Sequence, residues 1–432
     1  MNINKQFKNV LKLANTRTAR SSLIIFAASI FAALLSFVVA YFASRLLGPS
    51  DYGRLAIANA IIAIVVGVTD FGLATTLVKH TSHRLEDRLK TAPFFQTVFC
   101  IELALGLLIL IACLFTNQIA DLLGGQQLRI PILAGLLTAF FLSINAYTNA
   151  VLQAYGKFKT MAILNSAFAA LRTGLFLLLV AASMVTLSTT LAVNFSVAVV
   201  VLIVGLIIIP RTRVKTSWVA KKHAAVEIFH FSMWLVLSFV INSILARLDI
   251  LMISKFTNPE EVGYYAAALQ LSSFMPLLLA SFSTVLIPKV TSLPDDEVIS
   301  YIKKVLTGGV LAIIALSPFI LLSDPLIHLA FGARFSQSTQ IFQILFISYA
   351  LVLLVNPASF IFYKFNKPKL LTAVNLITAS TQVLLYIIFI PNMHGRGAAI
   401  ALLLNTLISL VVIYGLLYRL LRKQGIIGVP HA

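Results

Sequence analysis

The sequence predicts an all-α integral membrane protein with about twelve transmembrane helices in two six-helix lobes. Three observations predict this class: the composition, the spacing of the polar joints and an internal repeat. Of the 432 residues, 59% are hydrophobic and only 11% are charged, whereas about a quarter are charged in soluble domains. The apolar residues fall in blocks of about 20 to 28, the length that a helix needs to cross a hydrocarbon core. Such a chain is expected to cross the membrane repeatedly.

Each predicted span is a block of mostly apolar residues between short polar joints. The joint before Leu187 is very short, so counts of eleven or thirteen also fit the pattern. The first block is too long for the apolar region of a signal peptide and leads straight into further spans, so we expect it to remain as the first helix. The predicted spans are Ser21–Ser44, Leu55–Val78, Pro93–Thr116, Ile130–Gln153, Met161–Met184, Leu187–Ile209, Val226–Ser254, Val262–Pro288, Ile302–Ser323, Ile341–Tyr363, Leu370–Ile390 and Gly397–Tyr418.

The net charge of +19 is distributed unevenly between the two sides of this topology. The termini and alternate joints carry 25 of the 33 Lys and Arg residues. By the positive-inside rule this side is cytoplasmic, so both termini are expected in the cytoplasm and the number of spans must be even. The basic residues therefore report topology, and no nucleic-acid partner is expected. The opposite side holds only Arg45, Arg54, Arg129, Lys255, Arg334 and Arg396.

An internal repeat relates the two halves at an offset of 210 residues. The chain reads GPSDYGRLAIA from Gly48 and NPEEVGYYAAA from Asn258. Because each half has an even number of spans, the halves are expected to be parallel repeats with a cavity between them that opens alternately to each side, as in transporters. We expect an N-terminal lobe at 1–210, a cytoplasmic linker at 211–225 and a C-terminal lobe at 226–432. The recurring pairs include Pro49 and Pro259, Gly53 and Gly263, Lys157 and Lys367, Lys159 and Lys369, and Asn165 and Asn375.

Metal, disulfide and nucleotide chemistry find no support in the sequence. Cys100 and Cys113 lie about 20 Å apart on one predicted helix, too far for a disulfide. His80 and His83 have no obvious third ligand, and we interpret them as a solvated pair rather than a metal site. No GxxxxGK[ST] phosphate-binding motif occurs. We therefore expect no cofactor, no metal and no enzymatic activity.

Ionisable side chains inside spans are costly, at about 2.5–3.5 kcal/mol each, and are candidates for lining the cavity. Arg172 and Glu102 lie near the middle of the fifth and third spans, and Arg247 and Asp249 lie in the seventh. Arg247 and Asp249 are two residues apart and point to different helix faces, so they are poorly placed to neutralise each other. We expect the arginines to line the cavity, and Asp249 and Glu102 to couple transport to protons or sodium. The alternative is that these groups pair internally and fasten helices together.

Amide side chains extend the same pattern. Asn165 and Arg172 are seven residues apart and share one helix face. Their repeat partners, Asn375 and Gln382, share the matching face of the eleventh span. We predict that both faces line the cavity.

Two stretches resemble the polysaccharide biosynthesis family of the MOP exporter superfamily, whose O-antigen members are called Wzx flippases. They are RLLGPSDYGRLAIANAIIAIVVGVTDFGLATTLVK from Arg45 and RLDILMISKFTNPEEVGYYAAALQL from Arg247. The similarity in pattern extends over essentially the whole chain. It implies a MOP/MATE-like V-shaped architecture in the bacterial inner membrane.

The resemblance also implies a function. Such a flippase moves undecaprenyl-diphosphate-linked repeat units of O-antigen, capsule or exopolysaccharide by alternating access, alongside other polysaccharide assembly proteins. The resemblance further implies a cationic lumen, a role open to Arg172 and Arg247, with Arg45 and Arg54 at the outer mouth. Guanidinium groups suit this role because they bind diphosphate in a forked geometry.

Two alternatives stay open. A MATE-type small-molecule or ion antiporter shares the architecture, but usually has an acidic residue in its first helix, and Ser21–Ser44 contains none. A membrane polysaccharide polymerase or ligase usually holds catalytic groups on a large outward loop. The longest outward joints here, 117–129 and 324–340, are short by comparison.

Overall fold

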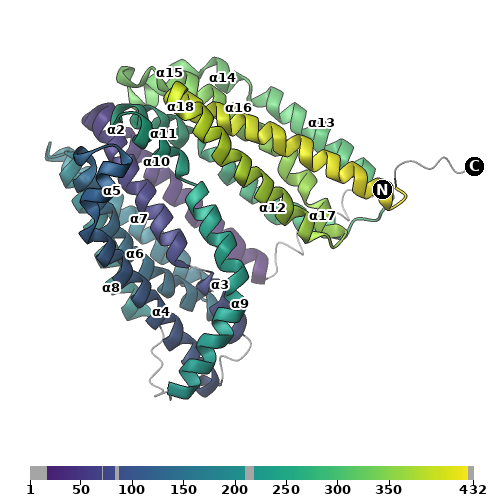
Figure 1. Ribbon diagram of the computed structural model, residues 1–432, viewed down its shortest axis with the longest axis horizontal. Helices are drawn as coiled ribbons and strands as arrows, with labels where there is room; N and C mark the ends of the chain where they lie inside the picture. The colour runs from purple at the N-terminus through teal and green to yellow at the C-terminus, as the bar shows by residue number, and fades with distance from the viewer. Residues whose placement is uncertain (1–16, 71, 83–86, 210–217, 427–432) are drawn as a thin grey trace, which may run out of the picture. The chain divides into compact units, whose positions relative to one another are not determined.

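The computed structural model describes residues 17–70, 72–82, 87–209 and 218–426 (Figure 1). Every regular element in these ranges is helical. Among the described residues, eight helical stretches are long and apolar enough to cross a membrane. Two of them, Ile24–Thr81 with 58 residues and Lys369–Lys423 with 55, are each long enough for two passes at 1.5 Å per residue. The prediction of an all-helical, multi-pass membrane protein is confirmed.

The chain divides into two compact units by its internal contacts. The first comprises residues 1–47 and 57–248, and the second comprises residues 48–56 and 249–432. The short segment 48–56 lies within α2 (Arg17–Asp70), just after a break in the helix at Gly48, whose φ of 74° is not helical. A single element, broken at Gly48, therefore contributes residues to both units.

The first unit is built around α6, which packs against α3, α4, α7 and α8. Thr69 of α2 donates a hydrogen bond to Ser143 of α6 at 2.8 Å. A buried apolar cluster joins Leu77, Phe95, Tyr147 and Ile228 from four helices. Besides α2, the elements are α3 (Leu73–Thr81), α4 (Arg88–Leu114), α5 (Thr116–Leu123), η1 (Gln126–Leu128), α6 (Arg129–Ala154), α7 (Phe158–Ala181), α8 (Leu187–Ile208) and α9 (Trp218–Leu245).

The second unit has α16 at its centre, lying beside α13 and α18 (Figure 1) and also packing against α11 and α12. Its apolar core includes Val290, Val298, Phe362 and Leu417. The elements are α10 (Leu248–Phe256), α11 (Pro259–Ser272), α12 (Phe274–Thr291), α13 (Val298–Leu316), α14 (Pro318–Leu321), α15 (Ser323–Phe331), η2 (Ala333–Phe335), α16 (Ser338–Ser359), α17 (Ile361–Lys364) and α18 (Pro368–Lys423, broken at His394).

Several predicted spans are not continuous helices. They include Ile302–Ser323, which is divided between α13 and α14, and Ile341–Tyr363, which is divided between α16 and α17. The predicted Leu55–Val78 is interrupted at Gly72, which has a φ of 67°. The predicted Val262–Pro288 divides at Ser273 into α11 and α12. The predicted Val226–Ser254 divides between Leu245 and Leu248. Hydrophobic composition reports burial in lipid and is insensitive to a change of backbone direction within an apolar block, so the sequence pattern missed these breaks.

The repeat predicted at an offset of 210 residues recurs in local backbone geometry. Gly156 and Asn366 both have left-handed φ, 64° and 50°. The next residues, Lys157 and Lys367, each donate their N–H to a carbonyl five residues back, at 2.8 Å in both cases. Each lysine then precedes the first residue of a long helix. The same helix ending and the same helix start therefore occur in both units.

Candidate functional site

A buried carboxylate lies at the meeting point of several helices in the second unit. Asp249 is only 6% exposed. The hydroxyl of Tyr265 in α11 donates a hydrogen bond to its Oδ2 at 2.6 Å, and the N–H of Ile250 donates to its Oδ1 at 2.8 Å. Tyr386 of α18 and Tyr349 of α16 also lie close enough for electrostatic interaction with this cluster. A buried carboxylate needs such donors, because desolvation without them is expensive.

The local sequence explains why the chain turns here. The N–H of Arg247 bonds to the carbonyl of Ile244, only three residues back, which tightens and ends α9. Asp249 stands in the first turn of α10, where its carboxylate can accept a backbone N–H and is favoured by the helix dipole. Arg247 therefore lies at the joint between two helices rather than within the continuous span that was predicted.

Gln382 lies one turn before Tyr386 on α18 and is 6% exposed. It thus belongs to the surroundings of the Asp249 cluster, since Tyr386 lies beside both side chains. Asn375, one heptad earlier, is exposed. The structure therefore places Gln382 near Asp249, although the sequence had assigned Gln382 to the cavity lining and Asp249 to ion coupling.

The first unit contains a second buried carboxylate. Glu102 of α4 is 1% exposed, and its Oε2 makes no hydrogen bond to any described residue. Asp70, at the end of α2, is close enough to interact with it electrostatically. Two carboxylates near one another cannot both ionise easily, so this pair is suited to holding a proton or a cation.

The predicted arginines occupy different settings. Arg172 on α7 and Arg247 are half-buried, and Arg45 is exposed, with its guanidinium 4.4 Å from the centre of the Tyr41 ring. These three belong to the first unit. Arg54, in the second unit, forms an ion pair with Asp51 at 2.9 Å, so its charge is matched locally. Asn165 is exposed on α7.

Sequence reasoning missed Tyr265 and Tyr386. A tyrosine in an apolar helix is usually interpreted as a core residue. Tyr265 lies 16 residues from Asp249, on the next helix, and Tyr386 lies much further along the chain. The available signal was the carboxylate itself, because a buried Asp requires donors.

The interpretation of His80 as solvated was wrong. Its ring stacks on Phe94 at 5.1 Å between centroids, and its Nδ1 lies 3.6 Å from Glu227 of α9. The physical reason is the packing of α9 against α3, which the sequence pattern did not reveal. Its predicted companion His83 lies outside the described residues. Within the described ranges, no group of three or more His, Cys, Asp or Glu side chains could hold a metal ion.

Apolar helices long enough to cross the bilayer, together with ionisable side chains buried inside them, define a multi-pass membrane protein of the transporter class. Solved structures with this fold include an inward-facing multidrug resistance MATE family transporter of the MOP superfamily. It matches with a TM-score of 0.74 at 14% identity, covering 91% of this chain and 95% of that one. The lipid II flippase MurJ, in an inward closed conformation, matches with a TM-score of 0.72 at 15% identity, covering 92% and 87%.

Two relatives are similar to this chain in sequence, and both are named for glycan or lipopolysaccharide biosynthesis. The chain is 25% identical over 405 residues to the probable low-salt glycan biosynthesis flippase Agl15 of Haloferax volcanii, covering 91% of this chain and 77% of that protein. It is 23% identical over 316 residues to the lipopolysaccharide biosynthesis protein WzxC of Escherichia coli K12, covering 70% and 61%. The profile of the polysaccharide biosynthesis protein family matches residues 42–340. The chain belongs to that family.

Proposed function

We propose that the protein is a flippase that moves undecaprenyl-diphosphate-linked oligosaccharides, the repeat units of O-antigen, capsule or exopolysaccharide, across the bacterial inner membrane. The observation that carries the proposal is the 25% identity with a glycan biosynthesis flippase over 91% of this chain. The membership of the polysaccharide biosynthesis family supports the same cargo class. Other polysaccharide assembly proteins are the expected partners.

The architecture we propose has twelve spans in two lobes, with the linker 211–225 between them and both termini in the cytoplasm. The two long broken elements α2 and α18 would each supply two spans. The broken pairs α9 with α10 and α11 with α12 would supply the seventh and eighth. Alternating access between the lobes would carry the headgroup across, as in other transporters built from parallel repeats.

Binding of the diphosphate is assigned to Arg172 and Arg247, with Arg45 and Arg54 at the outer mouth and Asn165, Asn375 and Gln382 as polar lining. The half-burial of Arg172 and Arg247 supports this assignment, because partial desolvation strengthens a forked guanidinium–phosphate bond. The assignment of Arg54 has the least support, because Asp51 already neutralises its charge.

Ion coupling is assigned to Asp249 and Glu102. Both carboxylates are buried, so a change in water access during transport would change their tendency to hold a proton or a sodium ion. The proximity of Asp70 to Glu102 supports that half of the assignment.

Deletion of the gene, followed by analysis of membrane lipids, tests the proposed cargo. A flippase defect should cause complete lipid-linked repeat units to accumulate while surface polysaccharide disappears. A polymerase defect should instead leave single repeat units exported to the surface. An unchanged lipid-linked pool with increased drug sensitivity would contradict the proposal and favour a MATE-type antiporter.

A further inference from the structure

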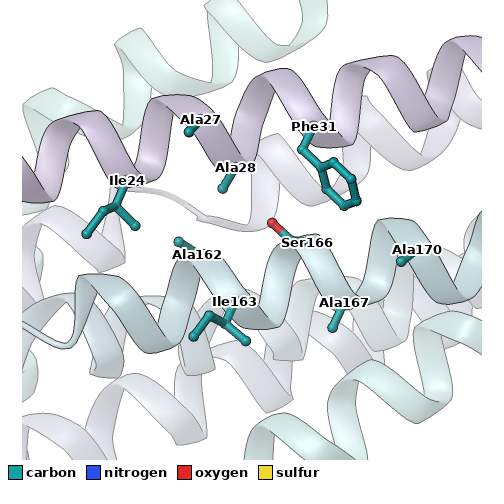
Figure 2. Close-up of a pocket in the computed structure, with 9 residues that line it drawn as sticks. All are labelled: Ile24, Ala27, Ala28, Phe31, Ala162, Ile163, Ser166, Ala167 and Ala170. Carbon is teal, nitrogen blue, oxygen red and sulfur yellow. The ribbon is translucent and has the colours of Figure 1, made fainter.

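A groove in the first unit runs between α2 and α7 (Figure 2). Its volume is about 490 Å³, within the range of about 300–1,000 Å³ usual for ligand pockets. Of the nine lining residues, five are alanines and Ser166 is the one polar residue. The facing residues include Ile24, Ala28 and Phe31 from α2, and Ala162, Ser166 and Ala170 from α7.

The groove exists because small side chains face each other beside a close helix contact. Thr173 of α7 donates a hydrogen bond to the carbonyl of Leu35 in α2 at 3.4 Å. On the N-terminal side of this contact, alanines are too small to fill the space between the helices. From Ala162 to Ala170 the groove follows about 12 Å of α7. Both helices are apolar enough to cross the membrane, so the expected occupant is hydrocarbon.

Positive charge gathers at one end of the groove. Lys159 precedes Ala162 and Ile163 by three and four residues and therefore projects from the same side of α7. Lys157 is the N-cap of α7, and its side chain makes no hydrogen bond to the N–H groups of the first turn. Both lysines are exposed. The free N–H groups and the positive end of the helix dipole add to the two ammonium charges. An amphiphile with an anionic head and an apolar tail would match both the apolar groove and the positive charge at its end.

We propose that this groove binds the polyprenyl diphosphate carrier of the cargo, with the hydrocarbon between α2 and α7 and the diphosphate at Lys157 and Lys159. The inference rests on the proposed flippase function and adds the place where the carrier meets the protein on the cytoplasmic side. All nine lining residues come from two neighbouring helices, and a groove of this width suits one hydrocarbon chain rather than the two tails of a phospholipid. A diphosphate also carries more charge than a phosphodiester, which suits two lysines.

The site is separate from the face that carries Arg172. Arg172 follows Ala170 by two residues and so lies about 200° around α7. The groove and its lysines would hold the diphosphate before transport, and Arg172 would hold it within the cavity during transport. The two binding steps therefore depend on different sides of the same helix.

Native mass spectrometry of the full-length protein tests the inference, with undecaprenyl diphosphate as the probe and phosphatidylglycerol in a parallel arm. Ala27→Phe and Ala167→Phe fill the groove from its two walls. Ala33→Phe is the matched control, because Ala33 is exposed on the opposite side of α2. If a phenylalanine variant is not monodisperse, Ala167→Leu replaces it.

We expect undecaprenyl diphosphate to bind at least about tenfold more weakly to the groove variants and equally well to the control, a difference of about 1.4 kcal/mol. Lys159→Glu should weaken binding, and Lys159→Arg should preserve it. Normal binding to the groove variants would overturn the inference and leave the flippase function standing. Equal binding of phosphatidylglycerol, lost in the same variants, would show a general lipid site and also overturn it. Failure of the unaltered protein to bind the probe would overturn both.

Discussion

Gly53 and Gly263 make reciprocal backbone contacts: a Cβ atom on Gly53 would overlap the carbonyl oxygen of Pro259, and one on Gly263 would overlap that of Pro49. These four residues are the two Pro–Gly pairs that recur at the offset of 210. The glycine of each copy of the repeat thus packs against the proline carbonyl of the other copy. All four residues lie in the second unit. The repeated Gly–Pro pattern therefore has a packing function, because it lets two helix starts cross at backbone distance.

Gly53→Ala and Gly263→Ala should each destabilise the protein. Overpacking usually costs about 1–3 kcal/mol, and here the overlapping atoms are backbone, which cannot rotate aside. Thermal unfolding of the purified protein should show a lower Tm for both variants.

Gly415→Ala is the matched control for this pair. Gly415 lies in α18, and a Cβ there would meet nothing within 4 Å. Alanine should be neutral or stabilising by up to about 1 kcal/mol at such a helical position. Equal Tm values for all three variants would mean that the crossing is looser than the structure indicates.

The topology is tested by cysteine labelling in a background in which Cys100 and Cys113 are replaced by serine. Cysteine introduced at Ser50 or Gln126 should react with an impermeant thiol reagent in intact cells, and cysteine at Ser82 or Thr216 should react only after permeabilisation. Thr216 lies outside the described residues and enters through the sequence prediction alone. Labelling at Ser82 in intact cells would reverse the assigned orientation.

The arginine assignment predicts loss of export without loss of protein. Removing a charge that contacts a bound anion typically costs about 2–5 kcal/mol, so Arg172→Ala and Arg247→Ala should each reduce surface polysaccharide at least about tenfold. Lys at either position should rescue poorly, because it keeps the charge and loses the planar fork of donors. The measurement is surface polysaccharide at matched membrane protein levels.

Arg129→Ala serves as the control, since Arg129 is exposed at the start of α6. Export at normal levels in both Arg172→Ala and Arg247→Ala would show that these arginines have a structural role and do not bind the diphosphate.

Because Tyr265 donates a hydrogen bond to Asp249, we expect the two side chains to stabilise the protein as a pair. A hydrogen bond to a charged group contributes about 1.5–3 kcal/mol, so Tyr265→Phe should lower the Tm, whereas Tyr418→Phe, at an exposed position, should not. The effects of Tyr265→Phe and Asp249→Asn should be non-additive in a double-mutant cycle. Additive effects would show that the two side chains are energetically independent.

Coupling is a separate prediction for Asp249 and Glu102. Asp249→Asn and Glu102→Gln cannot change charge, so at least one of them should make transport insensitive to an imposed proton or sodium gradient. If both variants kept full, gradient-sensitive transport, neither carboxylate would be the coupling site.

The sequence predicted the helical class and most helix positions because burial in lipid leaves a strong compositional signal. It placed α6 and α8 within a few residues of their ends, and it identified Gly53 and Gly263 as a repeated pair. It could not place the breaks at Gly72, Arg247 and Ser273, since these depend on backbone hydrogen bonds within apolar blocks.

The surroundings of the candidate site were harder to predict for a related reason. Tyr265 and Glu227 become partners of Asp249 and His80 only through helix packing. The side chains that require partners were visible in the sequence, whereas the partners themselves were not.

Flipping by the purified protein tests the central claim most directly. The protein is reconstituted into phosphatidylcholine vesicles that hold a fluorescent undecaprenyl-diphosphate-linked oligosaccharide in both leaflets, and impermeant dithionite is added outside. We predict that the protein makes the inner-leaflet probe accessible to dithionite and that the Arg172→Ala, Arg247→Ala double variant does not. Bleaching confined to the outer leaflet, as in protein-free vesicles, would contradict the account.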